Sequence, residues 1–302
     1  MRSLKFGLIA SAFVALSMSG TEARSDTWVG GGINAVYPGI PADQVEFISS
    51  PDRIISVTSS NSPSLIWETL EHGEKVECLQ CIPSVGALLY DQHQQTREIA
   101  AWWLRRRIFG VFGDGQVYSQ TLDVLKGDAN PQKRAYAAYA IGEFLDSAGI
   151  TPLSNAITND SSPLVRAAAA SALGRMNSAG TNGALSKALL DSDPGVQTSA
   201  IKAAGRVNEF TDEQTASKLV GSPNPTVRAL GVGLLEDLHA KDTVASVISL
   251  AQNDTDINVR INACHALGVF RDSSASSALQ NIANNDASTL VRDAAIIALR
   301  RL

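Results

Sequence analysis

The stretch Asp160-Ser-Ser-Pro-Leu-Val-Arg-Ala-Ala-Ala-Ala-Ser-Ala-Leu-Gly174 decides the fold of this 302-residue chain, because its pattern recurs along the sequence. Aligned on Arg166, the recurrences have their anchors at Arg97, Arg134, Arg166, Gln197, Arg228, Arg260 and Arg292. Six residues before these anchors stand Asp91, Asp128, Asp160, Asp191, Ser222, Asp254 and Asp286. After a first interval of 37 residues, the anchors are 31 or 32 residues apart. Self-similarity at one such period indicates a repeat protein.

Each feature of the unit has a physical role. A proline three residues before several anchors suits the first turn of a helix, where its missing N–H costs nothing. The third position after the anchor is small and the seventh is mostly Leu or Ile, and these offsets share one helical face. A shorter apolar segment before each anchor, such as Leu153–Ile157, supplies a first helix. One helix–turn–helix unit cannot bury its faces alone, so we predict an all-α fold, an α-solenoid (superhelix) of about seven hairpins over residues 83–302.

The quoted segment and Asp254-Thr-Asp-Ile-Asn-Val-Arg-Ile-Asn-Ala-Cys-His-Ala-Leu-Gly268 resemble the short HEAT repeats of the phycobilisome-lyase-like type. In that family the recurrent Asp and Arg form a ladder of bonds between successive repeats. The resemblance therefore implies a structural role for Asp128, Arg134, Asp160, Arg166, Asp254, Arg260, Asp286 and Arg292. Gln197 and Ser222 depart from the pattern, which predicts a looser or bent stack at repeats four and five.

The same resemblance raises an enzymatic alternative. Relatives include bilin lyases and metal-dependent deoxyhypusine hydroxylases, and the hydroxylases hold iron with repeated His-Glu pairs. This sequence has no His-Glu dipeptide, and its four histidines sit at unrelated offsets of the repeat. We expect no catalytic residue, no metal site and no cofactor. A lyase-like or metal-assisted enzyme on the same fold stays as the alternative, because fold alone does not supply an activity.

The N-terminus has the pattern of a secretory signal. Arg2 and Lys5 precede an apolar run over residues 6–18, and small residues surround the cleavage point that we expect after Ala23. We therefore expect residues 1–23 to be a signal peptide and the mature protein to be soluble in a periplasm or outside the cell. Residues 24–62 lack helical periodicity and predict an extended arm. Residues 63–82 predict a capping helix that carries a Cys-x-x-Cys motif.

Composition narrows the class of partner. With 44% apolar and 18% charged residues, the chain can bury a continuous core. Its formal net charge of −5 gives no overall attraction to nucleic acid. No stretch after the signal is long and apolar enough to cross a membrane. We therefore expect a protein partner, no nucleic acid and no membrane span.

The three cysteines fall into two environments. Cys264 occupies a repeat position that is otherwise apolar, so we expect it to be reduced and buried. Cys78 and Cys81 lie in the cap, outside the repeats, and a disulfide between them is the favoured interpretation in an oxidising compartment. A redox pair, or a metal site that recruits a histidine, stays open as an alternative.

Positions that vary within the repeat mark a surface that the fold does not dictate. The fifth and ninth offsets lie one turn apart on the second helices, which line the concave side of such stacks. Candidates for partner binding at these offsets are Trp102, Arg106, Tyr139, Glu143, Arg175, Lys202 and Arg206. A merely solvated face is the plain alternative. The expected function is that of an exported non-enzymatic scaffold or adaptor, with possible self-association through the apolar C-terminal repeat.

Overall fold

The computed structural model of this chain describes residues 50–109 and 115–302. The chain divides into two units, residues 1–46 and residues 47–302, and the described residues all belong to the second. They contain α-helices and short 3-10 turns but no strand. The α-helices are α3 (Pro51–Val57), α4 (Pro63–His72), α5 (Ile82–Ala87), α6 (Gln94–Arg105), α7 (Gln116–Gly127), α8 (Pro131–Phe144), α9 (Ile150–Asn159), α10 (Pro163–Met176), α11 (Asn182–Leu189), α12 (Pro194–Ala204), α13 (Glu213–Ser217), α14 (Pro225–Leu238), α15 (Val244–Asn253), α16 (Ile257–Phe270), α17 (Ser276–Asn285) and α18 (Thr289–Leu299).

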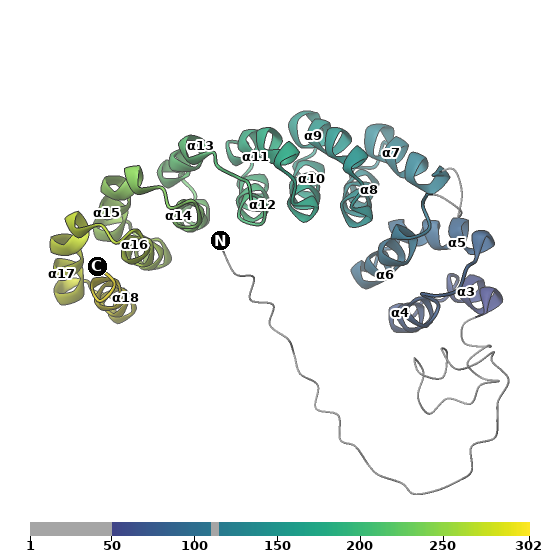
Figure 1. Ribbon diagram of the computed structural model, residues 1–302, viewed down its shortest axis with the longest axis horizontal. Coiled ribbons are helices and arrows are strands. Elements are labelled where there is room, and N and C mark those ends of the chain that lie inside the picture. The colour runs from purple at the N-terminus through teal and green to yellow at the C-terminus, as the bar shows by residue number, and fades with distance from the viewer. Residues whose placement is uncertain (1–49, 110–114) are drawn as a thin grey trace, which may run out of the picture. The chain divides into compact units, whose positions relative to one another are not determined.

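Successive helices pair into hairpins, and the hairpins stack into two layers (Figure 1). The second helices, α6, α8, α10, α12, α14, α16 and α18, lie side by side in one layer. The first helices form the other layer, each packed on its own second helix. Within residues 50–302 the second helices follow the inner side of the curve in Figure 1. The predicted α-solenoid is confirmed, and we call the exposed side of the second helices the inner face.

The second helices share a pattern of hydrogen bonds at their N-termini. The recurrent Asp accepts the backbone N–H of the residue that caps the helix, as Asp160 does from Ser162 at 2.8 Å and Asp254 from Asp256 at 2.9 Å. In α8, α12, α14 and α16 the capping side chain also accepts an N–H of the first helical turn, as Asp256 does from Asn258 at 2.8 Å. A proline at the start of α8, α10, α12 and α14 needs no such partner.

The small and large positions of the repeat fill the space between the layers. Ala137, Ala169, Ala200, Ala263 and Ala295 are fully buried. Glycine allows second helices to approach further, because a Cβ on Gly142 would lie 2.7 Å from the Cα of Ala172 in the next repeat. The core is therefore continuous from hairpin to hairpin, as a solenoid requires.

The region before the repeats differs from expectation. The extended arm predicted for residues 24–62 is wrong at its C-terminal end, because Pro51–Val57 forms α3. Ser50 caps this helix by accepting the N–H of Arg53, and Ile54 and Val57 are buried. α3 packs on α4, and α4 on α6, so the cap is an eighth helical pair. The predicted capping helix is present as α4, while residues 1–49, including the expected signal peptide, lie outside the described part of the chain.

Candidate functional site

The predicted ladder of Arg and Asp side chains runs along the stack. Each rung is a two-pronged ion pair in which the Arg Nε and Nη2 donate to both oxygens of an Asp in the following repeat. The four rungs, given as Nε–Oδ2 distances, are Arg134–Asp160 at 2.8 Å, Arg166–Asp191 at 2.7 Å, Arg228–Asp254 at 2.7 Å and Arg260–Asp286 at 2.9 Å. The Nη1 of each Arg also donates to a backbone carbonyl of its own repeat. One guanidinium therefore bonds to two repeats at once.

The membership of the ladder differs in part from the prediction. Asp191 and Arg228, which the resemblance did not assign, each complete a rung. Asp128 accepts only from within its own repeat among the described residues, and the Arg292 side chain donates to the carbonyl of Asp286. At the first repeat, Arg97 lies over the ring of Tyr136, 3.8 Å from its centroid, and makes no rung.

The rungs change the acidity of their carboxyl groups. The bond from Arg228 is the main cause that lowers the pKa of Asp254. Burial alone would raise the pKa of Asp160, Asp191 and Asp286, and bonds from Arg and backbone amides outweigh it. All four carboxyl groups are therefore ionised at neutral pH and hold the repeats together.

In the first half of the inner face, most of the predicted binding residues bond to one another. Arg105 Nη2 donates to Glu143 Oε2 at 3.0 Å, and Arg175 pairs with the other oxygen of the same carboxylate. Arg175 also lies over the ring of Tyr139 and donates to its hydroxyl. Glu143 thus joins α6, α8 and α10, and it is a structural acceptor here.

Arg106 and Trp102 lie at the start of the same face, next to the buried Trp103. Arg106 Nη1 donates to Glu74 at 2.7 Å, which ties α6 to the segment after α4. Trp102 is exposed, as the fifth offset predicts. Trp103 is fully buried under the cap, and its indole N–H donates to the carbonyl of Gly73 at 3.1 Å.

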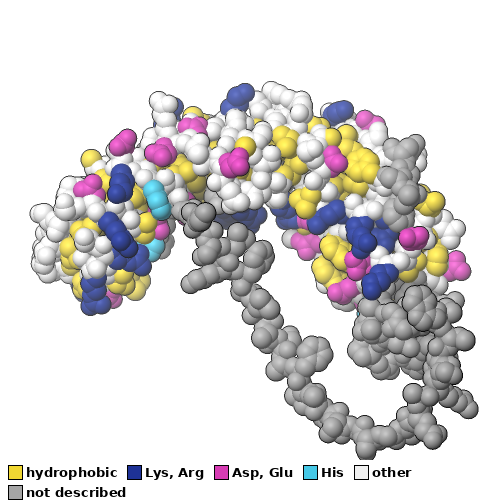
Figure 2. Space-filling model, viewed as in Figure 1, with side chains coloured by type: hydrophobic (Ala, Val, Ile, Leu, Met, Phe, Trp, Pro, Cys, Tyr) yellow, Lys and Arg dark blue, Asp and Glu magenta, His cyan; other side chains and the backbone are white. Residues whose placement is uncertain are grey.

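Lys202 and Arg206 differ from the other candidates. Both are exposed on α12 and just after it, and neither side chain has a hydrogen bond or ion pair with any residue that the structure describes. They line a cleft of about 420 Å³ between α12 and α14. The cleft is also lined by Ile201, Gly205, Ala229, Leu230, Gly233, Leu234, Glu236, Asp237 and Asn262. Figure 2 shows Lys and Arg side chains gathered along the inner edge of the second helices. Among the predicted binding residues, Lys202 and Arg206 are the two charged ones whose side chains have no hydrogen bond or ion pair with a described residue.

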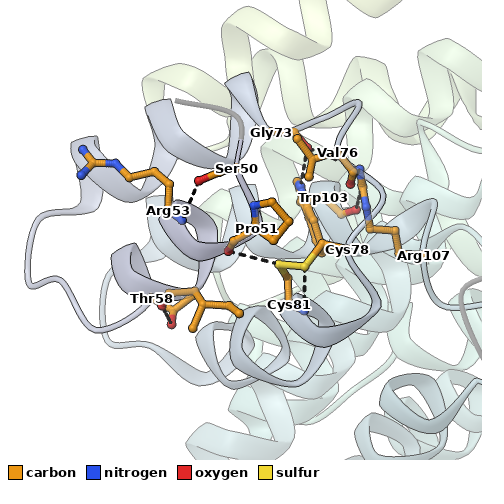
Figure 3. Close-up of a disulfide and its surroundings, with 11 residues drawn as sticks. Ser50, Pro51, Arg53, Thr58, Gly73, Val76, Cys78, Cys81, Trp103 and Arg107 are labelled. Carbon is orange, nitrogen blue, oxygen red and sulfur yellow. Dashed lines mark hydrogen bonds between the residues drawn. A yellow bond between two sulfur atoms is a disulfide. The ribbon is translucent and has the colours of Figure 1, made fainter. Parts of the chain in front are cut away.

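The Cys pair lies in the cap, beneath α3 (Figure 3). The sulfur atoms of Cys78 and Cys81 are 2.00 Å apart, the distance of a disulfide, and both residues are buried. Cys81 Sγ lies 3.6 Å from the carbonyl oxygen of Pro51, the first residue of α3. The disulfide therefore closes the turn on which α3 rests.

A buried arginine that the sequence analysis did not assign completes the cap. Arg107 is 4% exposed, stacks over the ring of Trp103, and donates to the carbonyl groups of Glu74 and Val76 (Figure 3). Burial, followed by the charge of Arg106, lowers its pKa to about 10. The guanidinium is thus charged at neutral pH and fixes residues 73–76 against α6.

The third cysteine and one of the histidines have defined surroundings. Cys264 is free and buried in α16, as predicted, and burial raises the pKa of its thiol to about 12. His265 Nδ1 lies 2.7 Å from Glu236 Oε2. Within residues 50–109 and 115–302, no group of three or more His, Cys, Asp or Glu side chains is placed to hold a metal ion. No helix in that part of the chain is long and apolar enough to cross a membrane.

Some residues of this face could not be found from the repeat alone. Arg105 and Glu74 lie outside the two offsets that define the predicted surface, yet their partners Glu143 and Arg106 lie within it. The run of three Arg at 105–107 was the only signal for them. The cleft had one signal, the loss of the ladder pattern at Gln197 and Ser222.

Known structures share this fold at low sequence identity. The protein YibA of Escherichia coli has 16% identity and a TM-score of 0.57 over 93% of this chain and 100% of that chain. The karyopherin Kap121p bound to Nup53p has 12% identity and a TM-score of 0.58 over 89% of this chain, which spans 34% of Kap121p. Kap95p with RanGDP has 13% identity and a TM-score of 0.59, with 87% of this chain and 39% of that chain covered. Likeness at these identities shows the fold alone.

Sequence comparison gives the family. No curated protein matches the chain. A family model of HEAT repeats matches residues 118–205, 150–222 and 213–300, which together make up more than half of the sequence. These matches coincide with the hairpins from α7 to α18 and with all four rungs of the ladder. The chain therefore belongs to the HEAT-repeat proteins.

Proposed function

We propose that this protein is an exported, non-enzymatic scaffold that binds a protein partner on its inner face. The observation that carries the proposal is the pair of exposed cations, Lys202 and Arg206, which have no partner among the described residues. Arg105, Arg106 and Arg175 on the same face are held by acidic side chains of the chain itself. Karyopherins of the same fold have been solved with protein partners bound.

The proposed location rests on the N-terminal pattern and is supported by the disulfide. A positive pair, Arg2 and Lys5, precedes the apolar run at 6–18, which is the order of a secretory signal. Disulfides persist in oxidising compartments, and the cap holds one between Cys78 and Cys81. N-terminal sequencing of the protein from an envelope fraction should read from Arg24. A mature chain that still begins at Met1 would contradict export by cleavage.

Partner capture tests the scaffold function. We expect wild-type protein to retain a defined protein from a native envelope extract, and the variant Lys202→Glu/Arg206→Glu to lose it while keeping its helical circular dichroism. Lys133→Glu/Lys187→Glu is the matched control, because it makes the same charge change at exposed residues that do not line this cleft. Arg106→Glu would not be a clean test of binding, since it would place like charges beside Glu74.

Capture also separates the scaffold from the enzymatic alternative. A pigment or metal bound in stoichiometric amount to the purified protein, with no protein partner, would replace the scaffold with a lyase-like or metal-assisted enzyme. Retention of the partner by the folded Lys202→Glu/Arg206→Glu variant would leave the scaffold and move its binding site. The exposed Leu290 and Ile297 of the last hairpin would then be examined first, together with self-association.

A further inference from the structure

The stack changes its regular construction between α12 and α14. The rung that would join these repeats is missing on both sides, because Gln197 replaces the Arg and Ser222 replaces the Asp. α8, α10, α14 and α16 each run for 14 residues and end on a residue with positive φ. α12 runs for 11 residues, and the next residue, Gly205, has a right-handed φ of −63°. From α8 to α16, α12 is therefore the second helix that ends differently, and it ends as α6 and α18 do at the two ends of the stack.

A second difference, in the residue that faces the glycine of α12, keeps the backbones of α12 and α14 apart. Where second helices pack tightly, a glycine of one faces an alanine of the next: a Cβ on Gly174 would lie 2.7 Å from the Cα of Ala203, and one on Gly268 would lie 2.9 Å from that of Ala298. At the junction the glycine is kept as Gly205, but Leu234 occupies the alanine position. A Cβ on Gly205 would meet no backbone of α14 and would approach only Asp237 Oδ2, at 3.5 Å, on that helix. The larger side chain of Leu234 therefore acts as a wedge: it separates α14 from α12, and the backbone of α12 at Gly205 borders the cleft.

The cleft at this junction has two cations on one side, two carboxylates that have partners of their own on the other, and apolar side chains between them. The cations are Lys202 and Arg206, which are unpaired among the residues of the described range. On the other side Glu236 is bonded to His265 at 2.7 Å, and Asp237 also has an interaction of its own. Between them lie Leu230, which is half-buried, and Leu234, which is 3% exposed. The formal charges of the four charged groups that line the cleft balance, and Lys202 and Arg206 are the two among them that have no hydrogen bond or ion pair with a described residue.

We propose that this cleft binds an extended acidic segment of the protein partner. Its carboxylates pair with Lys202 and Arg206, and an apolar side chain covers Leu230 and Leu234. The two glycines at the cleft, Gly205 and Gly233, allow a peptide backbone to approach closely, since a Cβ on Gly233 would meet nothing within 4 Å. This inference rests on the proposed scaffold function and specifies its partner, because it names the chemistry that the site recognises.

Peptide probes test the charge requirement. The probes are a fluorescein-labelled peptide of alternating Glu and Leu, six residues long, and its counterpart with Gln in place of Glu. We expect wild-type protein to bind the Glu peptide at least about tenfold more tightly than the Gln peptide in low salt. Lys202→Gln/Arg206→Gln should remove the difference, and Lys133→Gln/Lys187→Gln should keep it. Equal affinity for the two peptides, or no binding of either, would overturn the proposal.

Two further variants test the cleft without touching its cations. Gln197→Arg/Ser222→Asp/Leu234→Ala restores the ladder and the glycine–alanine contact, so it should close the junction. The affinity for the Glu peptide should then fall by about tenfold or more. Gly233→Phe should have the same effect on affinity by filling the open space beside Leu230 and Leu234. Unchanged affinity in both variants would mean that the cations attract acidic peptides without the cleft.

Failure of this inference can be told from failure of the scaffold function. If wild-type protein captures a native partner and Gly233→Phe captures it equally, the partner binds elsewhere and only the cleft assignment is wrong. If wild-type protein captures no partner although the Glu peptide binds as expected, the cleft does recognise acidic peptides and the scaffold function is wrong. A peptide in which phosphoserine replaces Glu and binds more tightly than the Glu peptide would also overturn the choice of carboxylate.

Discussion

Arg105, Arg106 and Arg107 are consecutive in the sequence, and each guanidinium has a different environment. Arg105 bonds to Glu143 of the next repeat, and Arg106 bonds to Glu74 before the repeats. Arg107 is buried, and its donors are satisfied in large part by backbone carbonyls of residues 73–76. A planar, permanently charged group suits this place, because its fork of N–H donors reaches several acceptors at once.

Substitution of Arg107 should therefore destabilise the cap more than its neighbour's substitution does. Arg107→Lys places a single ammonium where several carbonyls need donors, and we expect a loss of about 1–3 kcal/mol in unfolding free energy. Fluorescence should change as well, since Arg107 stacks on Trp103. The control, Arg106→Lys, alters a side chain that is 67% exposed and should cost less than about 0.5 kcal/mol. Equal losses in a urea titration would contradict the assigned role of Arg107.

At the scale of the element, one rung connects two hairpins. Asp254 is nearly buried, accepts both prongs of Arg228, and also accepts the N–H of Asp256. The same carboxylate therefore shapes the turn before α16 and bonds α16 to the repeat before it. Such a double role explains why Asp recurs at this position along the chain.

The rung should make stability depend on pH. Because the folded pKa of Asp254 is lowered, chiefly by Arg228, its contribution is present above the unfolded pKa of about 3.9 and is lost as pH falls through the folded value. We expect Asp254→Asn to cost about 1–3 kcal/mol at pH 7 and progressively less below about pH 4. Asp128→Asn, which removes no ion pair between repeats, should show a smaller dependence. A wild-type-to-Asp254→Asn difference that stays constant down to pH 2 would refute this account.

The elements that the sequence predicted are those that local patterns specify. Asp160, the proline after it and the alanines of α10 act within one hairpin or its neighbour, so a period of 31 or 32 residues predicts them. α3 was missed because its seven residues contain too little periodic sequence to distinguish a helix from an arm. The wedge at Leu234 was missed because its effect depends on Gly205 in the previous repeat, and only the packed structure pairs the two.

At the scale of the whole molecule, the described part of the chain is a row of hairpins in which each hairpin packs on the next. Each second helix contacts the next one, so the free energy of unfolding is close to the sum of the contributions of the single hairpins and of the interfaces between them. A change at one place should then stay local. The cysteines give two ways to examine this, because one pair lies in the cap and the third lies far along the stack in α16.

Thiol counting should distinguish the two environments. Unreduced protein in denaturant should give one free thiol, that of Cys264. Native protein should give none on the same timescale, because this side chain is fully buried and burial raises the pKa of its thiol to about 12. Three free thiols in protein taken directly from the envelope would rule out the disulfide and reopen the metal site.

Removal of the disulfide should loosen the cap and leave the distant repeats unchanged. Cys78→Ala/Cys81→Ala opens a short closed loop, for which chain entropy gives a loss of about 2 kcal/mol. The loss should fall on α3, α4 and the end of α6, since α3 rests on the disulfide turn and Arg107, just after α6, bonds to the segment that follows α4. Hydrogen exchange followed by mass spectrometry should show faster exchange there and unchanged rates in α14, α16 and α18. Faster exchange throughout would mean that the chain unfolds as one cooperative unit. The open junction between α12 and α14 would then have to transmit stability as well as a regular interface does, although it lacks the rung.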